Sequence, residues 1–165
     1  FVRINGITKS NISEVYEILI DVVKTAPKGK EGSELSEKLK IEGVEVKMDH
    51  NSTFVLLCSH NTRDKKCGQT APYMKKEFES QLGEHNLLRD SNDDRPDGAQ
   101  VIFINHVGGH KFAANVLIHK RNGEFIWFAR CSPLNVKPLV EETIINGKIF
   151  PDNVRTCKKF ESIDW

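Results

Sequence analysis

Several features that would place this chain in a common class are missing from its sequence. No apolar run approaches the roughly 18 residues of a transmembrane helix, and no signal peptide is visible. Lys and Arg number 24 against 23 Asp and Glu, so no net field would attract nucleic acid or an anionic membrane. We therefore expect neither nucleic acid nor a membrane among the partners.

Cysteine is also scarce. Four cysteines in 165 residues are too few for a disulfide scaffold, which favours a reducing compartment, the cytoplasm. The chain has no nucleophile elbow, phosphate loop, Ser/His/Asp arrangement or Cys-x-x-Cys pair, so we expect no enzyme with its own substrate pocket. It opens on Phe1 rather than Met, and we expect it to be a piece of a longer protein.

The first third of the chain predicts an extension ahead of the main domain. Apolar positions recur at helical spacing over residues 10–25, and a polar, glycine-rich linker follows at 26–33. Residues 35–39 suggest a turn of helix, and 43–48 suggest a short edge strand. We assign residues 1–51 to an N-terminal extension of helix plus linker.

Stronger patterns follow residue 51. We predict strands at 53–57, 99–104, 113–119 and 125–130, the last two flanking an Asn-Gly turn, and helices at 70–83 and 139–147. A βαβ unit followed by a hairpin and a helix is the thioredoxin-like arrangement. The prediction is an α/β domain over 52–157, with a central mixed sheet flanked by helices, and a mobile polar tail at 158–165.

Two pairs of metal-ligating residues follow the apolar runs. Cys58 and Cys67 come after one predicted strand, and His106-Val-Gly-Gly-His110 comes after the next. The glycine pair frees the backbone to turn sharply or lets something bulky approach. Thiolate and imidazole together suit zinc, iron–sulfur clusters or copper. Eight residues separate the cysteines, more than in a compact zinc knuckle, so the wide loop favours a [2Fe–2S] cluster with two cysteine and two histidine ligands.

The motifs that carry a family resemblance are Cys58-Ser-His-x-x-Arg63-Asp64-Lys65-Lys66-Cys67, His106-Val-Gly-Gly-His110-Lys111-Phe112-Ala113-x-Asn115-Val116 and Val140-Glu141-Glu142-Thr143-Ile144. They resemble the sucrase/ferredoxin-like family, and the resemblance covers roughly residues 53–155. It implies a thioredoxin-like ferredoxin fold and a [2Fe–2S] cluster held at Cys58, Cys67, His106 and His110. Ferredoxins of this fold with four cysteine ligands carry cysteines where His106 and His110 stand, so the redox properties should differ.

Two imidazoles in place of two thiolates remove negative charge, so the reduction potential should exceed that of an all-cysteine cluster. Each imidazole keeps one nitrogen off the metal, so we expect electron transfer or redox sensing with proton-coupled reduction. Lys111 and Arg130 are further candidates for tuning the potential from beside the ligands. Lys65, Lys66 and Lys111 could also steer an acidic redox partner, although solvated loop charges explain them equally well.

Two other interpretations of the same residues remain open. The four ligands could hold a structural zinc ion, or Cys58 and Cys67 could form a reversible disulfide in a thiol oxidoreductase. The last three residues, Ile163, Asp164 and Trp165, resemble the C-terminal tripeptide by which client proteins recruit the cytosolic iron–sulfur assembly targeting complex. A docked tail without that role is the alternative.

Overall fold

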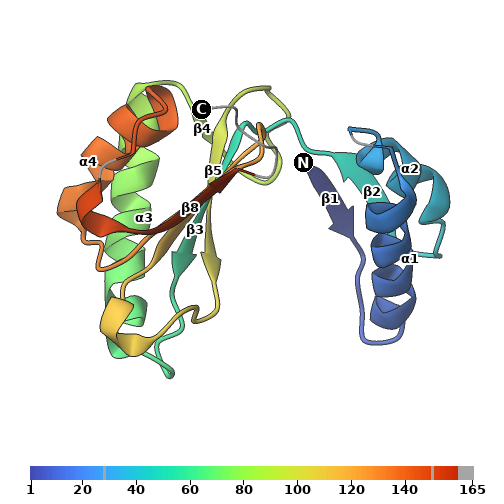
Figure 1. The fold of residues 1–165 in the computed structure, drawn as a ribbon, viewed down its shortest axis with the longest axis horizontal. Coiled ribbons are helices and arrows are strands. Elements are labelled where there is room, and N and C mark those ends of the chain that lie inside the picture. Colours follow the sequence, from blue (N-terminus) through green and yellow to red (C-terminus); the bar gives the residue numbers. More distant parts are fainter. Residues whose placement is uncertain (28, 150, 160–165) are drawn as a thin grey trace. The chain divides into compact units, whose positions relative to one another are not determined.

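The structure is a computed structural model, and it describes residues 1–27, 29–149 and 151–159. The chain divides into two compact units, Phe1–His50 and Asn51–Trp165 (Figure 1). No helix in the described ranges is long and apolar enough to cross a lipid bilayer.

The N-terminal unit is more than the predicted helix and linker. Its elements in chain order are β1 (Val2–Asn5), α1 (Ile12–Thr25), α2 (Glu31–Lys38) and β2 (Glu45–Met48). Strands β1 and β2 pair in antiparallel fashion, and the buried side chains of both helices form one small core with partly buried side chains of the strands. The predicted helix at 10–25 is confirmed as α1. The predicted linker at 26–33 is too long, because residues 31–33 already belong to α2, which begins at Glu31 and buries Leu35.

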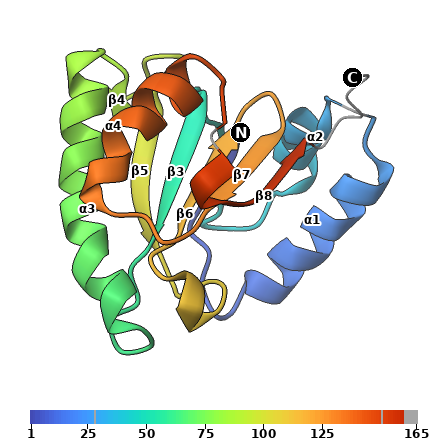
Figure 2. The ribbon, with the colours of Figure 1, turned by 60° about the vertical axis from the view of Figure 1, so that its left-hand side comes forward.

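The second unit is built on a six-stranded sheet in the order β4-β5-β3-β6-β7-β8. The strands are β3 (Thr53–Cys58), β4 (Leu88–Arg89), β5 (Ala99–Ile104), β6 (Val116–Lys120), β7 (Glu124–Phe128) and β8 (Val154–Lys159). Strand β3 runs parallel to β5 and antiparallel to β6, and β6, β7 and β8 continue antiparallel (Figure 2). The central order β5-β3-β6-β7 gives the predicted thioredoxin-like arrangement, a mixed sheet within an α/β fold.

In this unit α3 (Lys65–Glu84) packs on the central strands of the sheet, and the helical segment after β7 packs on α3. Helix α3 lies between β3 and β4 in the chain and packs on β3 and β5. The short α4 (Val136–Pro138) continues into a π-helix, η3 (Leu139–Ile145). Three 3-10 turns complete the unit: η1 (His110–Phe112), η2 (Pro133–Asn135) and η4 (Pro151–Asn153). The buried stripe of α3 consists of Cys67, Ala71, Met74, Phe78 and Leu82, so one candidate ligand belongs to the core-facing side of the helix.

Helix α3 begins five residues before its predicted start at residue 70. The Asp64 side chain accepts hydrogen bonds from the backbone N–H groups of Lys66 and Cys67, and this N-cap fixes the first turn. Pro72 therefore lies inside the helix rather than in its first turn. Tyr73 is exposed because it lies off the helix face that carries the buried stripe.

Strand β8 occupies the beginning of the predicted tail. Lys158 and Lys159 pair with Phe125 and Glu124 of β7, so the edge strand continues to residue 159. The remaining tail residues, including Ile163, Asp164 and Trp165, lie outside the described residues.

Candidate metal centre

The two candidate cysteines meet where β3 ends and α3 begins. Cys58 is the last residue of β3, and Cys67 lies in the first turn of α3. Both side chains are completely buried. The intervening loop doubles back tightly: a side chain on Gly68 would collide with the backbone of Asn61, so only glycine allows this close approach. The fold therefore brings the two thiols together despite their sequence separation.

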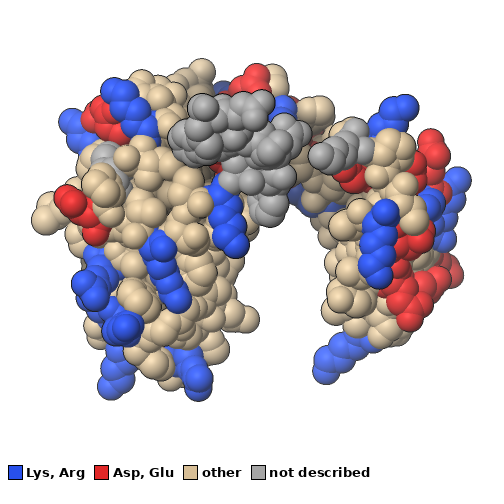
Figure 3. Space-filling view, in the orientation of Figure 1, with Lys and Arg blue, Asp and Glu red and all other residues tan. Residues whose placement is uncertain are grey.

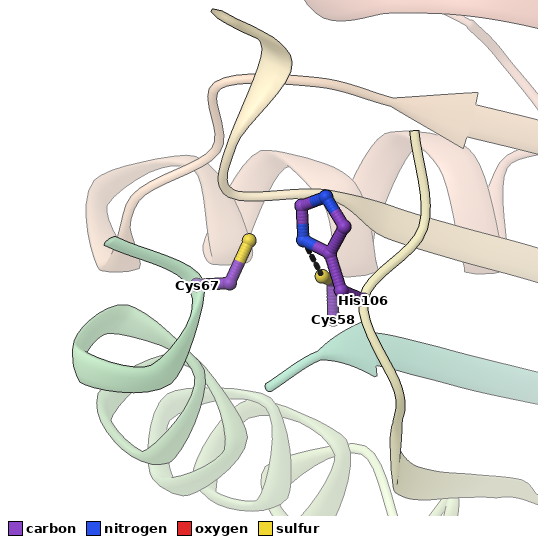
Figure 4. A group of neighbouring side chains, drawn as sticks. All are labelled: Cys58, Cys67 and His106. Carbon is purple, nitrogen blue, oxygen red and sulfur yellow. Dashed lines mark hydrogen bonds between the residues drawn. The ribbon is translucent and has the colours of Figure 1, made fainter. Parts of the chain in front are cut away.

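His106 joins the cysteines because β3 and β5 are parallel neighbours. The carboxyl ends of the two strands, Cys58 and Ile104, lie side by side, and His106 follows two residues later. Its Nδ1 lies 3.7 Å from the Sγ of Cys58. The donor atoms of Cys58, Cys67 and His106 all lie within 4.8 Å of one another and face a common space (Figure 4).

His110 lies beside this group but is not one of the three converging donors. Its ring stacks on that of His106, with centroids 5.0 Å apart and planes at 25°. The side chain is 62% exposed, and its Nδ1 donates a hydrogen bond to Oδ2 of Asp64 at 2.7 Å. Nε2 is therefore the ring nitrogen that remains for a metal.

Asp64 is a functional candidate that the sequence analysis did not identify. One carboxylate caps α3 through Oδ1 and holds His110 through Oδ2. It therefore connects the cysteine loop (residues 59–66) to the histidine loop (residues 106–110). The bond to His110 lowers the pKa of Asp64, because it favours the ionised carboxylate. An Asp three residues before a buried Cys has the spacing of a helix N-cap, and that signal could have found it.

The protonation of Cys67 depends on whether a cation is present. Burial, reinforced by the neighbouring Cys58, raises the pKa of Cys67 to about 12. The thiol is therefore protonated at neutral pH when no cation is near, and binding a metal would release its proton. A bound cation would favour the deprotonated form of Cys67, because its positive charge stabilises the thiolate.

The histidine loop is fixed from the interior of the unit. Asn115 is fully buried; its Nδ2 donates to the carbonyl of Val107 at 3.0 Å, and its Oδ1 accepts from Nε1 of Trp127 at 2.9 Å. Gly108 has a φ of +78°, and a side chain there would collide with the guanidinium of Arg155. The prediction that a loop glycine allows a turn and a bulky neighbour is confirmed at Gly108.

Lys111 and Arg130 both contact the ring of Phe112. Nε of Arg130 also donates to the carbonyl of Lys111 at 3.2 Å. Among the described residues, no hydrogen bond connects either to the four predicted ligands. Cys131 is also buried, but its thiol donates to the carbonyl of Ala129 and takes no part in the converging group.

Comparisons with known proteins identify the family. The model of the Sucrase/ferredoxin-like family matches residues 1–156, so the match includes the N-terminal unit as well as the 53–155 region where the motifs lie. Actin patches distal protein 1 of Saccharomyces cerevisiae is 48% identical over 130 residues, covering 76% of this chain and 41% of that protein. Altered inheritance of mitochondria protein 32 of Meyerozyma guilliermondii is 32% identical over 127 residues, covering 76% and 42%.

Among solved structures, a cysteine-to-serine variant of the thioredoxin-like [2Fe-2S] ferredoxin from Aquifex aeolicus matches with a TM-score of 0.49 and 14% identity. The match covers 63% of this chain and 98% of that one. The chain spans about two fifths of the length of the two curated relatives above. The family match extends over nearly the whole sequence, and the chain therefore belongs to the Sucrase/ferredoxin-like family.

Proposed function

We propose that this protein binds a [2Fe–2S] cluster through Cys58, Cys67, His106 and His110, and that it carries single electrons or senses redox state rather than acting as an enzyme. The observation that supports this most directly is the convergence of the buried thiols of Cys58 and Cys67 with His106, beside the stacked ring of His110. When bound, such a cluster accepts and releases one electron at a time.

The donor set fits this group chemically. Two thiols and two imidazoles match the mixed ligation known for binuclear iron–sulfur centres, in which nitrogen replaces sulfur on one iron and raises the potential. The family description also includes ferredoxin-like proteins. The buried cysteines would be shielded from water, and the exposed edge of His110 would face an approaching redox partner.

The two histidines would handle protons differently. His106 presents Nδ1 to Cys58, so Nε2 is the nitrogen free to hold a proton. His110 keeps its proton on Nδ1, from which it donates a hydrogen bond to the carboxylate of Asp64. Because each imidazole is more basic when the metal centre carries less positive charge, reduction should be accompanied by proton uptake.

A single tetrahedral ion such as zinc is the second candidate, and a specific distance favours it. The 3.7 Å between Cys58 Sγ and His106 Nδ1 matches the separation of two donors around one zinc ion, to which sulfur binds at about 2.3 Å and nitrogen at about 2.0 Å. The thiol oxidoreductase has less support, because both thiols are completely buried, whereas reactive cysteines are usually partly exposed.

The test is a metal and sulfide analysis of the chain purified without air. A cluster predicts two irons and two acid-labile sulfides per chain, visible absorption, and a paramagnetic resonance signal after reduction, with nitrogen hyperfine coupling from the histidines. Stoichiometric zinc in a colourless protein would overturn the cluster and establish the second candidate. A metal-free protein with a reversible Cys58–Cys67 disulfide would overturn both.

For the cellular setting we propose the cytoplasm, with a redox partner protein and, through Ile163, Asp164 and Trp165, the cytosolic iron–sulfur assembly targeting complex. A terminal aromatic after an apolar and an acidic residue offers an anchor for such recruitment. Deleting Trp165 should lower iron content in cells but leave chemical reconstitution intact. Normal iron content in the deleted chain would contradict the role of the tail.

A further inference from the structure

We propose that a basic pocket beside the histidine loop binds a carboxylate side chain of an acidic redox partner protein. The inference rests on the proposed electron-transfer function and extends it to the partner's docking chemistry. The principal groups are Arg130 and Arg155, with Phe112 between them.

The pocket is a cavity of about 540 Å³ in the second unit. It is formed where η1, the end of β7 and the start of β8 meet, and it is lined by Phe112, Ala129, Arg130, Asp152, Asn153, Val154 and Arg155. This volume is within the range that accommodates a ligand or a protruding side chain. Its lining contains one acidic residue, Asp152, and two arginines.

Arg155 is held flat by aromatic contacts. Its guanidinium carbon lies 4.4 Å from the ring centre of Phe112 and 4.2 Å from that of Trp127. Stacking of this kind uses the faces of a guanidinium and leaves its N–H edge available for a carboxylate. Side-chain freedom has already been lost in this arrangement, so binding an anion there costs less entropy.

Arg130 reaches the same pocket from an unusual backbone conformation. Its φ is +57°, a region that favours glycine. Its N–H donates to the carbonyl of Phe112 at 3.0 Å, and Nδ2 of Asn153 donates to the adjoining carbonyl of Ala129 at 3.0 Å. These two hydrogen bonds hold the backbone around residue 130 beside the pocket, which the Arg130 side chain lines.

These cations have no acidic partner within the part of the chain that the structure describes. In the described residues, no carboxylate lies within ion-pair distance of Lys111, Arg130 or Arg155, which contact aromatic rings instead. Several other exposed Lys and Arg side chains do form ion pairs. On the face shown in Figure 3, basic side chains gather at the end of this unit that carries η1, gold in Figure 1. An acidic partner would be drawn to this end of the unit.

The pocket lies beside the loop that carries the two candidate histidine ligands. Arg155 packs against Gly108, between the two candidate histidine ligands, and Phe112 lies two residues beyond His110. A carboxylate paired with Arg130 and Arg155 would therefore position a partner next to the exposed imidazole. Charge-assisted, two-point pairing of this kind also fixes orientation, which electron transfer between proteins requires.

The test uses a hexaglutamate peptide as the probe and the full chain carrying Trp165→Phe, in which Trp127 is the only tryptophan. Because Arg155 stacks on Trp127, peptide binding should change its fluorescence and weaken with added salt. Arg155→Gln should weaken binding at least tenfold. Arg130→Gly should do the same while keeping the fold, because glycine adopts a φ of +57° without strain.

The matched control is Lys158→Gln, which removes one exposed positive charge near the opposite end of β8. Binding should stay within twofold of the parent. Equal weakening by Lys158→Gln, or no weakening by Arg130→Gly and Arg155→Gln, would overturn the proposal. Tighter binding of inorganic phosphate than of hexaglutamate would also overturn it, in favour of a phosphorylated ligand.

A redox measurement separates this proposal from the function on which it rests. If the chain holds a cluster, Arg155→Gln should slow its oxidation by the anion ferricyanide but not by hexaamminecobalt(III), a cation. If the chain holds no iron yet binds hexaglutamate through Arg130 and Arg155, the carboxylate pocket is upheld and electron transfer is overturned.

Discussion

Oδ2 of Asp64 lies 2.7 Å from Nδ1 of His110, while Oδ1 of the same carboxylate accepts from the backbone at the start of α3. One side chain thus orients an exposed candidate ligand and fixes the helix turn that carries a buried one, Cys67. Carboxylates that hold a ligating histidine from behind set which nitrogen faces the metal and raise its basicity.

Replacing Asp64 should affect both functions of the carboxylate. Asp64→Ala removes the N-cap, which should lower the free energy of unfolding by about 1 kcal/mol, and it should weaken metal retention by roughly 10–100-fold. Asp64→Asn retains a capping oxygen, so it should weaken metal retention with a smaller loss of stability. Chemical denaturation and metal analysis after a chelator challenge measure the two effects. Unchanged retention in both variants would contradict the positioning role.

Exchanging a histidine ligand for cysteine should change the redox properties and keep the cluster. His110→Cys adds one thiolate, so the reduction potential should fall by on the order of 100–300 mV, about half of the rise that two histidines give, and should depend less on pH. In the parent protein the potential should fall as the pH rises through the oxidised-state pKa values. Potentiometric titration at several pH values measures both quantities. His60→Gln, in the cysteine loop, is the control and should leave the curve unchanged; an unaltered pH dependence in His110→Cys would exclude proton coupling through His110.

Two substitutions of buried cysteines should distinguish a metal ligand from a side chain that only packs in the core. Cys58→Ser should abolish bound iron and visible colour, because the cluster loses a thiolate ligand. Cys131→Ala removes another buried cysteine of the same core, outside the converging group, and should retain the iron. Iron and sulfide content per chain distinguish the two. Full colour in Cys58→Ser would refute the ligand assignment.

A histidine far from the centre should make stability depend on pH. Burial lowers the pKa of His119 below 6.5, and the ring packs on Phe125 with centroids 4.6 Å apart. The unfolded chain therefore binds this proton more tightly, so the free energy of unfolding should decrease as the pH falls through about 6.5. His119→Gln should reduce the difference in stability between about pH 7.5 and about pH 5.5, measured by chemical denaturation. Phe125→Leu should instead lower stability at both pH values by similar amounts.

The central strands could be predicted because their signals are local. Continuous apolar runs at 53–57 and 99–104 can be buried only inside a sheet, and the structure confirms both. Strand β8 was missed because an edge strand needs little apolar character. Its residues 154–159 include three Lys or Arg, and pairing with β7 defines it.

The sequence predicted the candidate ligands but not how their side chains are oriented. Ligand types and spacing predicted which side chains to consider, but not that His110 would turn outward to Asp64. That contact joins residues 46 positions apart, and it depends on where η1 and α3 lie after folding. The helix start predicted at residue 70 was also too late, because the Asp64 cap begins the helix at Lys65.

The complete burial of Cys58 and Cys67 has a consequence for the order of events during maturation. A metal can reach both sulfurs only when part of the surrounding chain opens, so we expect insertion into the folded chain to wait for a local unfolding event. Supplying iron and sulfide during refolding should therefore load the protein faster than adding them afterwards. The rate of late loading should follow the frequency of that opening rather than the concentration of iron.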